Sequence, residues 1–230
     1  MTTHYDQFTN GWNGFTTLAE FYDKFSSNDK RLGGEYDGYP NDANKHFTKK
    51  THMNAGFLIG KQYKTDGSEL DVEFTRDFPN GFALADRGQG IRVMKYLIDG
   101  EDHGQAGDEK NTLNDYAVLR YADVLLMYAE AVLRGGTETV GTALERYNEL
   151  RRKRITGYTD VATVTLDDIL DERGRELYWE GWRRPDLLRF NKFLNPTSVR
   201  KATSDKTKSL FPIPATALST NPNLTQNPGY

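Results

Sequence analysis

The sequence predicts a mainly α-helical fold whose first part is irregular, partly β and rich in loops. After residue 113, long segments carry apolar residues at every third or fourth position, the period of an amphipathic helix. Before it lie most of the glycines and a scatter of aromatic residues without a sustained helical period. The chain has no cysteine, which excludes a disulfide framework, a thiolate zinc site and a catalytic thiol.

Composition excludes several classes of protein. Aromatic residues make up 12% of the 230 residues, more than a disordered chain carries, although the mean hydropathy of −0.74 marks the chain as polar. With a net charge of −3, the chain does not have the excess of basic residues that is typical of a nucleic-acid-binding protein. The one dense basic run, residues 151–154, is interpreted as the solvated end of a helix. No run approaches the roughly 20 apolar residues of a membrane span.

A short helix, short strands and a turn are predicted in the first part of the chain. Residues 16–25 are predicted to form a short helix, because that conformation places Leu18, Phe21, Tyr22 and Phe25 on one face. Residues 53–63 and 90–98 are predicted to be short strands, and Gly33-Gly34 is predicted to be a turn.

The second part begins with the clearest helix, predicted over residues 116–133. Apolar residues follow two adjacent stripes on it, which predicts burial on most sides. Gly135-Gly136 ends this helix, and a second helix through Tyr147 and Leu150 is expected to pack against it as an antiparallel hairpin. Such a hairpin is the unit of tetratricopeptide-like repeats, but no second copy is detected.

Further helices are predicted towards the C-terminus. Thr165 to Asp168 resembles a capping box that opens a helix reaching Leu177 or Trp179, with Gly181 as its stop. Pro185 suits the first turn of the next helix. The prolines of the tail from Phe211 onwards predict an extended path over the surface.

The acidic residues of the helix around residue 172 raise the possibility of a glycoside hydrolase with Glu176 or Glu180 as its acid. Arginines are interleaved with these carboxylates, so we interpret them as structural ion pairs. No pair of carboxylates is singled out as facing a cleft, and no nucleophile elbow, phosphate loop, cofactor motif or metal-ligand spacing is present. The sequence therefore predicts no catalytic residue, no metal and no cofactor.

Aromatic residues gather at the N-terminal end, where nine fall within the first forty positions. Trp12 lies between two asparagines and two glycines. Sugar rings have apolar C–H faces and polar rims, so an exposed aromatic ring beside amide groups is typical of a sugar-binding site. Composition also leaves open that Trp12 packs in the core beneath a loop.

Four stretches together resemble the C-terminal part of the RagB/SusD family of outer-membrane nutrient-binding lipoproteins. They occur in the family's order and spacing, and the likeness covers nearly the whole chain. The stretches are YAVLRYADVLLMYAEA at 116–131, NELR at 148–151, ILDER at 169–173 continuing to WEGWRRPDL at 179–187, and FPIP at 211–214 continuing to NPNLTQNPGY at 221–230.

The resemblance implies a SusD-like fold in which residues 1–114 are an aromatic-rich ligand-binding segment. Residues 115–230 are then a helical C-terminal segment with an extended tail, in one continuous domain. Family members also have a lipidated cysteine and an N-terminal half, which this sequence lacks, so we expect the chain to be a C-terminal part. Any membrane attachment would be through that lipid anchor alone.

The resemblance also implies a function. The protein would bind glycans or oligosaccharides at the outer face of the outer membrane, without catalysis, and pass them to a TonB-dependent SusC-like transporter. By position, Trp12, Asn13, Tyr36 and Tyr39 are the expected ligand contacts. The alternative is a non-catalytic protein-interaction module in which the helical hairpin docks a partner and no sugar is bound.

Overall fold

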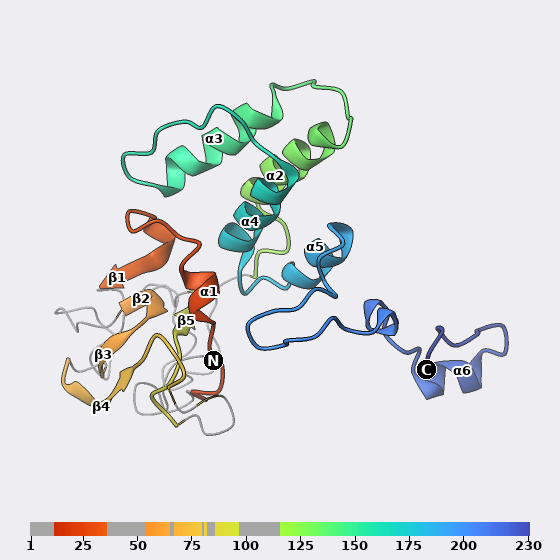
Figure 1. Cartoon of the computed structure of the whole chain (residues 1–230), viewed down its shortest axis with the longest axis horizontal. Helices are drawn as coiled ribbons and strands as arrows, with labels where there is room; N and C mark the ends of the chain where they lie inside the picture. The colour runs from red at the N-terminus through yellow and green to blue at the C-terminus, as the bar shows by residue number, and fades with distance from the viewer. Residues whose placement is uncertain (1–11, 36–53, 65–66, 80, 82–85, 97–115) are drawn as a thin grey trace, which may run out of the picture. The chain divides into compact units, whose positions relative to one another are not determined.

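The computed structural model describes residues 12–35, 54–64, 67–79, 81, 86–96 and 116–230. They fall into two compact units, Met1–Thr165 and Leu166–Tyr230. The first unit contains short strands and a helical hairpin, and the second contains helices and the C-terminal tail (Figure 1). The fold therefore mixes helices with short strands, as the sequence predicts.

Short antiparallel strands form two small sheets in the first unit (Figure 1). One sheet has the order β1 (Gly33–Glu35), β2 (Asn54–Leu58), β5 (Arg92–Met94). The other pairs β3 (Gly60–Tyr63) with β4 (Glu69–Phe74). The strand predicted over residues 53–63 is thus two strands in different sheets, because Gly60 has a φ of 75°.

The prediction of a turn at Gly33-Gly34 is wrong, because both glycines belong to strand β1. Gly33 is paired with Gly56 of β2. A Cβ atom on Gly33 would collide with the backbone of Ala55, so only glycine allows the two strands to come this close. Strand β4 was not predicted.

An aromatic cluster forms the core beside the first sheet. Helix α1 (Ala19–Tyr22) is shorter than the predicted helix, but its aromatic residues do share a face. Phe21, Tyr22 and Phe25 surround Phe57 of β2 with ring centroids 5.1–6.2 Å away and steep interplanar angles. Edge-to-face packing of this kind is favourable for buried aromatic rings.

The helical hairpin consists of α2 (Tyr121–Leu133) and α3 (Ala143–Arg154), which pack against each other as predicted. The predicted start of α2 at residue 116 is wrong. The helix begins after Arg120, whose backbone is extended, and the apolar spacing that predicted the earlier start carries no information about that backbone conformation.

The loop between α2 and α3 is fixed by local hydrogen bonds. The Tyr128 hydroxyl accepts from the backbone N–H groups of Thr139 and Val140 and donates to the carbonyl of Gly141. A capping box between Thr142 and Glu145 then starts α3. The basic residues 151–154 occupy the last turn of α3, where cations are favourable to the helix dipole.

The second unit contains α4 (Leu166–Leu177), α5 (Arg183–Arg189), the 3-10 turn η3 (Lys206–Ser209) and α6 (Ala215–Thr220). Pro185 lies in the first turn of α5, as predicted. The prediction of a wholly extended tail is wrong, because α6 interrupts it. Pro214 precedes this helix as its N-cap, and the next proline lies beyond its end, so no proline breaks its hydrogen bonding.

Candidate functional site

Trp12 is exposed to solvent over 72% of its surface. The neighbouring Phe15 is also exposed. The interpretation that Trp12 packs beneath a loop is therefore wrong, and the ring is available to contact a ligand.

The backbone turns sharply directly after this ring. Asn13 has a φ of 49°, in the left-handed region that asparagine tolerates better than most residues. Its side chain accepts a hydrogen bond from Nε of Arg92 at 2.7 Å and donates one to the carbonyl of Arg87 at 2.8 Å. Both polar atoms of the amide therefore hold the turn that presents Trp12.

Arg92 lies at the centre of this arrangement and is only 2% exposed. Besides Asn13, its guanidinium donates to the carbonyls of Arg87, Gln89 and Gly90 at 2.6–3.0 Å. Strand β5 positions the side chain, and the 86–90 turn wraps round it. One buried cation thus joins two loops that are more than seventy residues apart in the sequence.

Burial lowers the pKa of Arg92 to about 10, and the attraction of Asp86 opposes that shift. The guanidinium nevertheless carries its charge at neutral pH. Its carbon lies 4.7 Å from the ring centroid of Phe74, where the negative face of the ring stabilises a cation. Carbonyl oxygens and this ring take the place of water round the charge.

The predicted site residues have different outcomes. Trp12 and Asn13 lie together on the exposed turn, and Asn13 has internal partners there. Tyr36 and Tyr39 lie outside the described residues. Their role as ligand contacts stays a prediction.

Arg87 was not predicted. Its carbonyl accepts from Asn13 and Arg92, and its half-exposed guanidinium donates to the carbonyl of Asp71 on β4 at 3.3 Å. The Arg87 side chain, which carries hydrogen-bond donors, therefore lies in the loop whose backbone is bonded to Asn13 of the Trp12 turn. The sequence shows only a glycine-rich turn at 88–90, which carries no signal for this placement.

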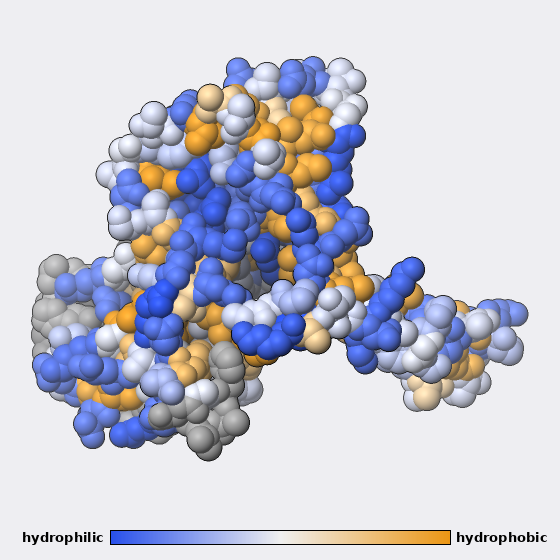
Figure 2. All heavy atoms as spheres, viewed as in Figure 1, coloured by the Kyte–Doolittle hydropathy of each residue, from blue (hydrophilic) through white to orange (hydrophobic). Residues whose placement is uncertain are grey.

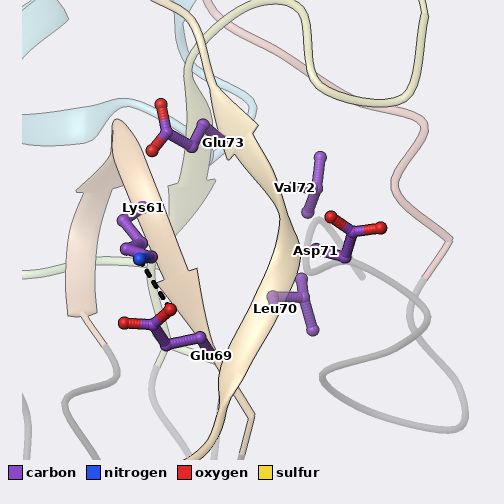
Figure 3. Close-up of a pocket in the computed structure, with 6 residues that line it drawn as sticks. All are labelled: Lys61, Glu69, Leu70, Asp71, Val72 and Glu73. Carbon is purple, nitrogen blue, oxygen red and sulfur yellow. Dashed lines mark ion pairs between the residues drawn. The ribbon is translucent and has the colours of Figure 1, made fainter.

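A shallow polar groove of about 450 Å³ runs along β4 and is lined by Lys61, Glu69, Leu70, Asp71, Val72 and Glu73 (Figure 3). Lys61 of β3 pairs with Glu69 at 2.6 Å, and Asp71 points away from that pair (Figure 3). The register between the strands shifts between Lys61 and Tyr63. A bulge of this kind re-aims side chains along a strand.

The carboxylates considered for hydrolysis are buried in or next to α4. Glu172 pairs with Arg175 at 2.6 Å, and Glu176 and Glu180 are both buried. Arg173 of α4 pairs with Asp186 of α5 at 2.9 Å, with each side chain 1% exposed. The interpretation of these charges as structural ion pairs is confirmed for the pairs named here.

Apolar side chains are exposed on α2 and just before it. They are Tyr116, Val118, Leu119, Tyr121, Val124 and Met127. Figure 2 shows hydrophobic residues gathered over the helical hairpin. Within the part of the chain that the structure describes, no helix is long and apolar enough to span a membrane, and no group of potential ligands suited to a metal ion is found.

Comparison with known proteins identifies close relatives in sequence. The starch-binding protein SusD of Bacteroides thetaiotaomicron is 38% identical over 177 residues, which cover 70% of this chain and 28% of that protein. A SusD-like protein of Formosa agariphila is 34% identical over 179 residues, which cover 72% of this chain and 34% of that one. The chain thus spans about a third of the length of these relatives.

A solved structure agrees with the sequence relatives. Surface glycan-binding protein A from Bacteroides uniformis is 26% identical and superposes with a TM-score of 0.59, covering 94% of this chain and 41% of that one. The model of the SusD family matches residues 2–230. With the fold, the curated relatives and the family model in agreement, the chain belongs to the SusD family.

Proposed function

We propose that this chain is the glycan-binding part of a cell-surface protein, and that the exposed Trp12 ring is the apolar half of its binding site. The observation that carries the proposal is the exposure of Trp12 on a turn fixed by internal hydrogen bonds. Two relatives support it, since one is a starch-binding protein and another a surface glycan-binding protein.

In this proposal the Trp12 ring stacks on the C–H face of a sugar, because an indole offers a large apolar surface at small entropic cost. Arg87, whose carbonyl is bonded to Asn13, is proposed to supply hydrogen-bond donors to the ligand. Asn13, Tyr36 and Tyr39 are proposed as further ligand contacts. Residues 1–114 would then form the ligand-binding segment and residues 115–230 the helical segment that supports it.

We also propose a wider role, which membership of the SusD family supports. The protein binds and does not catalyse, lies at the outer face of the outer membrane, and passes its glycan to a SusC-like TonB-dependent transporter. The α2–α3 hairpin would be one unit of a tetratricopeptide-like helical part.

A second candidate function is protein interaction through the hairpin. The uncharged, exposed side chains Tyr121, Val124 and Met127 on α2 favour it. A docking role for α2 is compatible with sugar binding at Trp12, but as the sole function it would leave Trp12 without a ligand.

The test is a Trp12→Ala variant measured by isothermal titration against neutral polysaccharides, including starch. We expect the affinity to fall more than tenfold, which corresponds to about 1.4 kcal/mol or more of binding free energy. Stability should change by less than about 0.5 kcal/mol, because exposed side chains contribute little to folding.

The matched control is Tyr121→Ala, which removes an equally exposed aromatic ring from α2. Its glycan affinity should equal that of the wild type. A Trp12→Ala variant that melts much earlier yet binds glycan normally would contradict the proposal.

A further inference from the structure

The turn that presents Trp12 has few constraints of its own. The residue after it, Asn13, is in the left-handed region, and the next residue is glycine. An exposed indole on such a turn would sample several orientations, and a ligand that selected one of them would have to overcome that loss of entropy.

The hydrogen bonds of Asn13 remove this freedom. Its Oδ1 accepts from Arg92, and its Nδ2 donates to the same Arg87 carbonyl that accepts from Arg92. The three residues form a closed set of hydrogen bonds directly beneath the Trp12 turn.

Arg92 is itself rigidly held. It belongs to β5, it donates to the carbonyls of Gln89 and Gly90, and its guanidinium lies over the Phe74 ring. The strand therefore fixes the guanidinium, the guanidinium fixes the Asn13 amide, and the amide fixes the backbone next to Trp12. A lysine could not replace it, because an ammonium lacks the planar fork that reaches several acceptors at once.

We propose that Arg92 is a positioning residue which, through the Asn13 amide, holds the Trp12 ring in the orientation that binds a glycan. This deepens the proposed function and rests on it for the ligand. Arg92 is buried and does not touch the sugar, and the contact between Arg92 and Asn13 acts separately from the ligand contact proposed for Asn13 itself. Their contribution is that the platform is ordered before the ligand arrives.

Two substitutions at Asn13 and one at Arg92 test the contact between these residues. Asn13→Gly keeps the left-handed backbone without strain but removes both side-chain hydrogen bonds. Asn13→Asp keeps the oxygen that accepts from Arg92 and tolerates the same backbone. Arg92→Lys tests the other end of the contact.

The order of Trp12 can be measured without any ligand. The chain has three tryptophans, so 5-fluorotryptophan labelling yields three 19F resonances, and a Trp12→Phe variant assigns the one from Trp12. In Asn13→Gly and Arg92→Lys we expect this resonance to shift and to relax as a mobile ring. In Asn13→Asp it should stay near its wild-type position. The other two tryptophans, Trp179 and Trp182, lie in the second unit, so their resonances are expected to stay unchanged. Thermal melts followed by circular dichroism report whether the fold of the first unit is retained.

Binding is then titrated with soluble starch. Asn13→Gly should lose roughly three- to tenfold in affinity, the range expected when one side chain must be ordered on binding. Asn13→Asp should rescue most of that loss. Asn191→Gly is the matched control, because Asn191 is another left-handed asparagine, in the second unit, and its replacement should change neither readout.

Two results would overturn the inference. A Trp12 resonance unchanged in both Asn13→Gly and Arg92→Lys would show that the contact does not order the ring. A mobile ring with unchanged affinity for starch would show that its order is irrelevant to binding. If the wild-type chain binds no glycan, the proposed function fails, and the 19F measurement still decides whether Arg92 orders Trp12.

Discussion

Helices α2 and α4 are almost the same length and both bury charged side chains, but they differ in how far their apolar residues are covered. In α2 the two carboxylates, Asp123 and Glu130, are buried, while Tyr121, Val124 and Met127 are exposed. In α4, Ile169, Leu170 and Leu177 are buried. The buried charges Glu172 and Arg173 have partners of opposite sign, as Glu130 of α2 has in Arg134. A helix that exposes apolar groups and buries its acids has more apolar surface than its hairpin partner covers.

The largest effect that would test this comparison is expected in α4. Arg173→Ala leaves Asp186 as a buried carboxylate that has lost one of its two arginine partners. Breaking a buried ion pair costs about 3–5 kcal/mol when the remaining charge is uncompensated. Arg189 still compensates part of the Asp186 charge, but the variant also removes the fully buried Arg173 side chain, so we expect a loss within this range. Urea denaturation followed by circular dichroism measures the loss.

The control is Asp167→Asn, which breaks the exposed pair between Asp167 and Lys192. Exposed pairs contribute about 0–1 kcal/mol, so the variant should unfold close to the wild type. Equal losses from the two variants would show that the α4 charges are not stabilised by their partners.

The next effect concerns the two faces of α2. Leu126 is 0% exposed and Val124 is 47% exposed, although the two residues are separated by a single position. Leu126→Ala should cost about 2–5 kcal/mol through lost burial and the cavity left behind. Val124→Ala should change stability by about 0.5 kcal/mol or less. Thermal melts of the two variants check this, and a Val124→Ala loss as large as that of Leu126→Ala would mean that both faces are covered.

Apolar periodicity was sufficient to predict the hairpin and α4. Residues such as Leu126, Tyr147 and Ile169 recur at helical spacing and are buried where that spacing places them. The prediction that the two stripes of residues 116–133 are buried on most sides is wrong, because Val118, Leu119 and Tyr121 of those stripes are exposed. The shared face of Phe21, Tyr22 and Phe25 could be predicted for the same reason. Helix boundaries were less certain, because the start of α2 depends on the backbone of Arg120 and not on hydrophobicity.

The candidate site could be predicted only in part. Trp12 was identified from its residue type and its neighbours, but its exposure was not decided by composition. Arg92 could not be identified, because three of its four acceptor groups are backbone carbonyls, which every residue carries. Strand β4 was missed although Leu70, Val72 and Phe74 alternate with acidic residues, which is the period of a strand and could have predicted it.

The smallest effect on stability, and the one that most sharpens the comparison, concerns the exposed face of α2. Val124→Glu combined with Met127→Lys places a favourable i, i+3 pair where two apolar groups are exposed. Stability should stay within about 0.5 kcal/mol of the wild type, because neither side chain is buried.

Association should change far more than stability. Contiguous exposed apolar surface drives self-association and the binding of hydrophobic dyes. We therefore expect the 230-residue chain to self-associate in analytical ultracentrifugation or to enhance the fluorescence of such a dye, and the double variant to do so much less.

Val140→Lys, at a single exposed apolar residue in the hairpin loop, should leave both signals unchanged, because it lies outside the α2 face. A wild-type chain that is monomeric, silent towards the dye and cooperative in melting would contradict an uncovered face on α2.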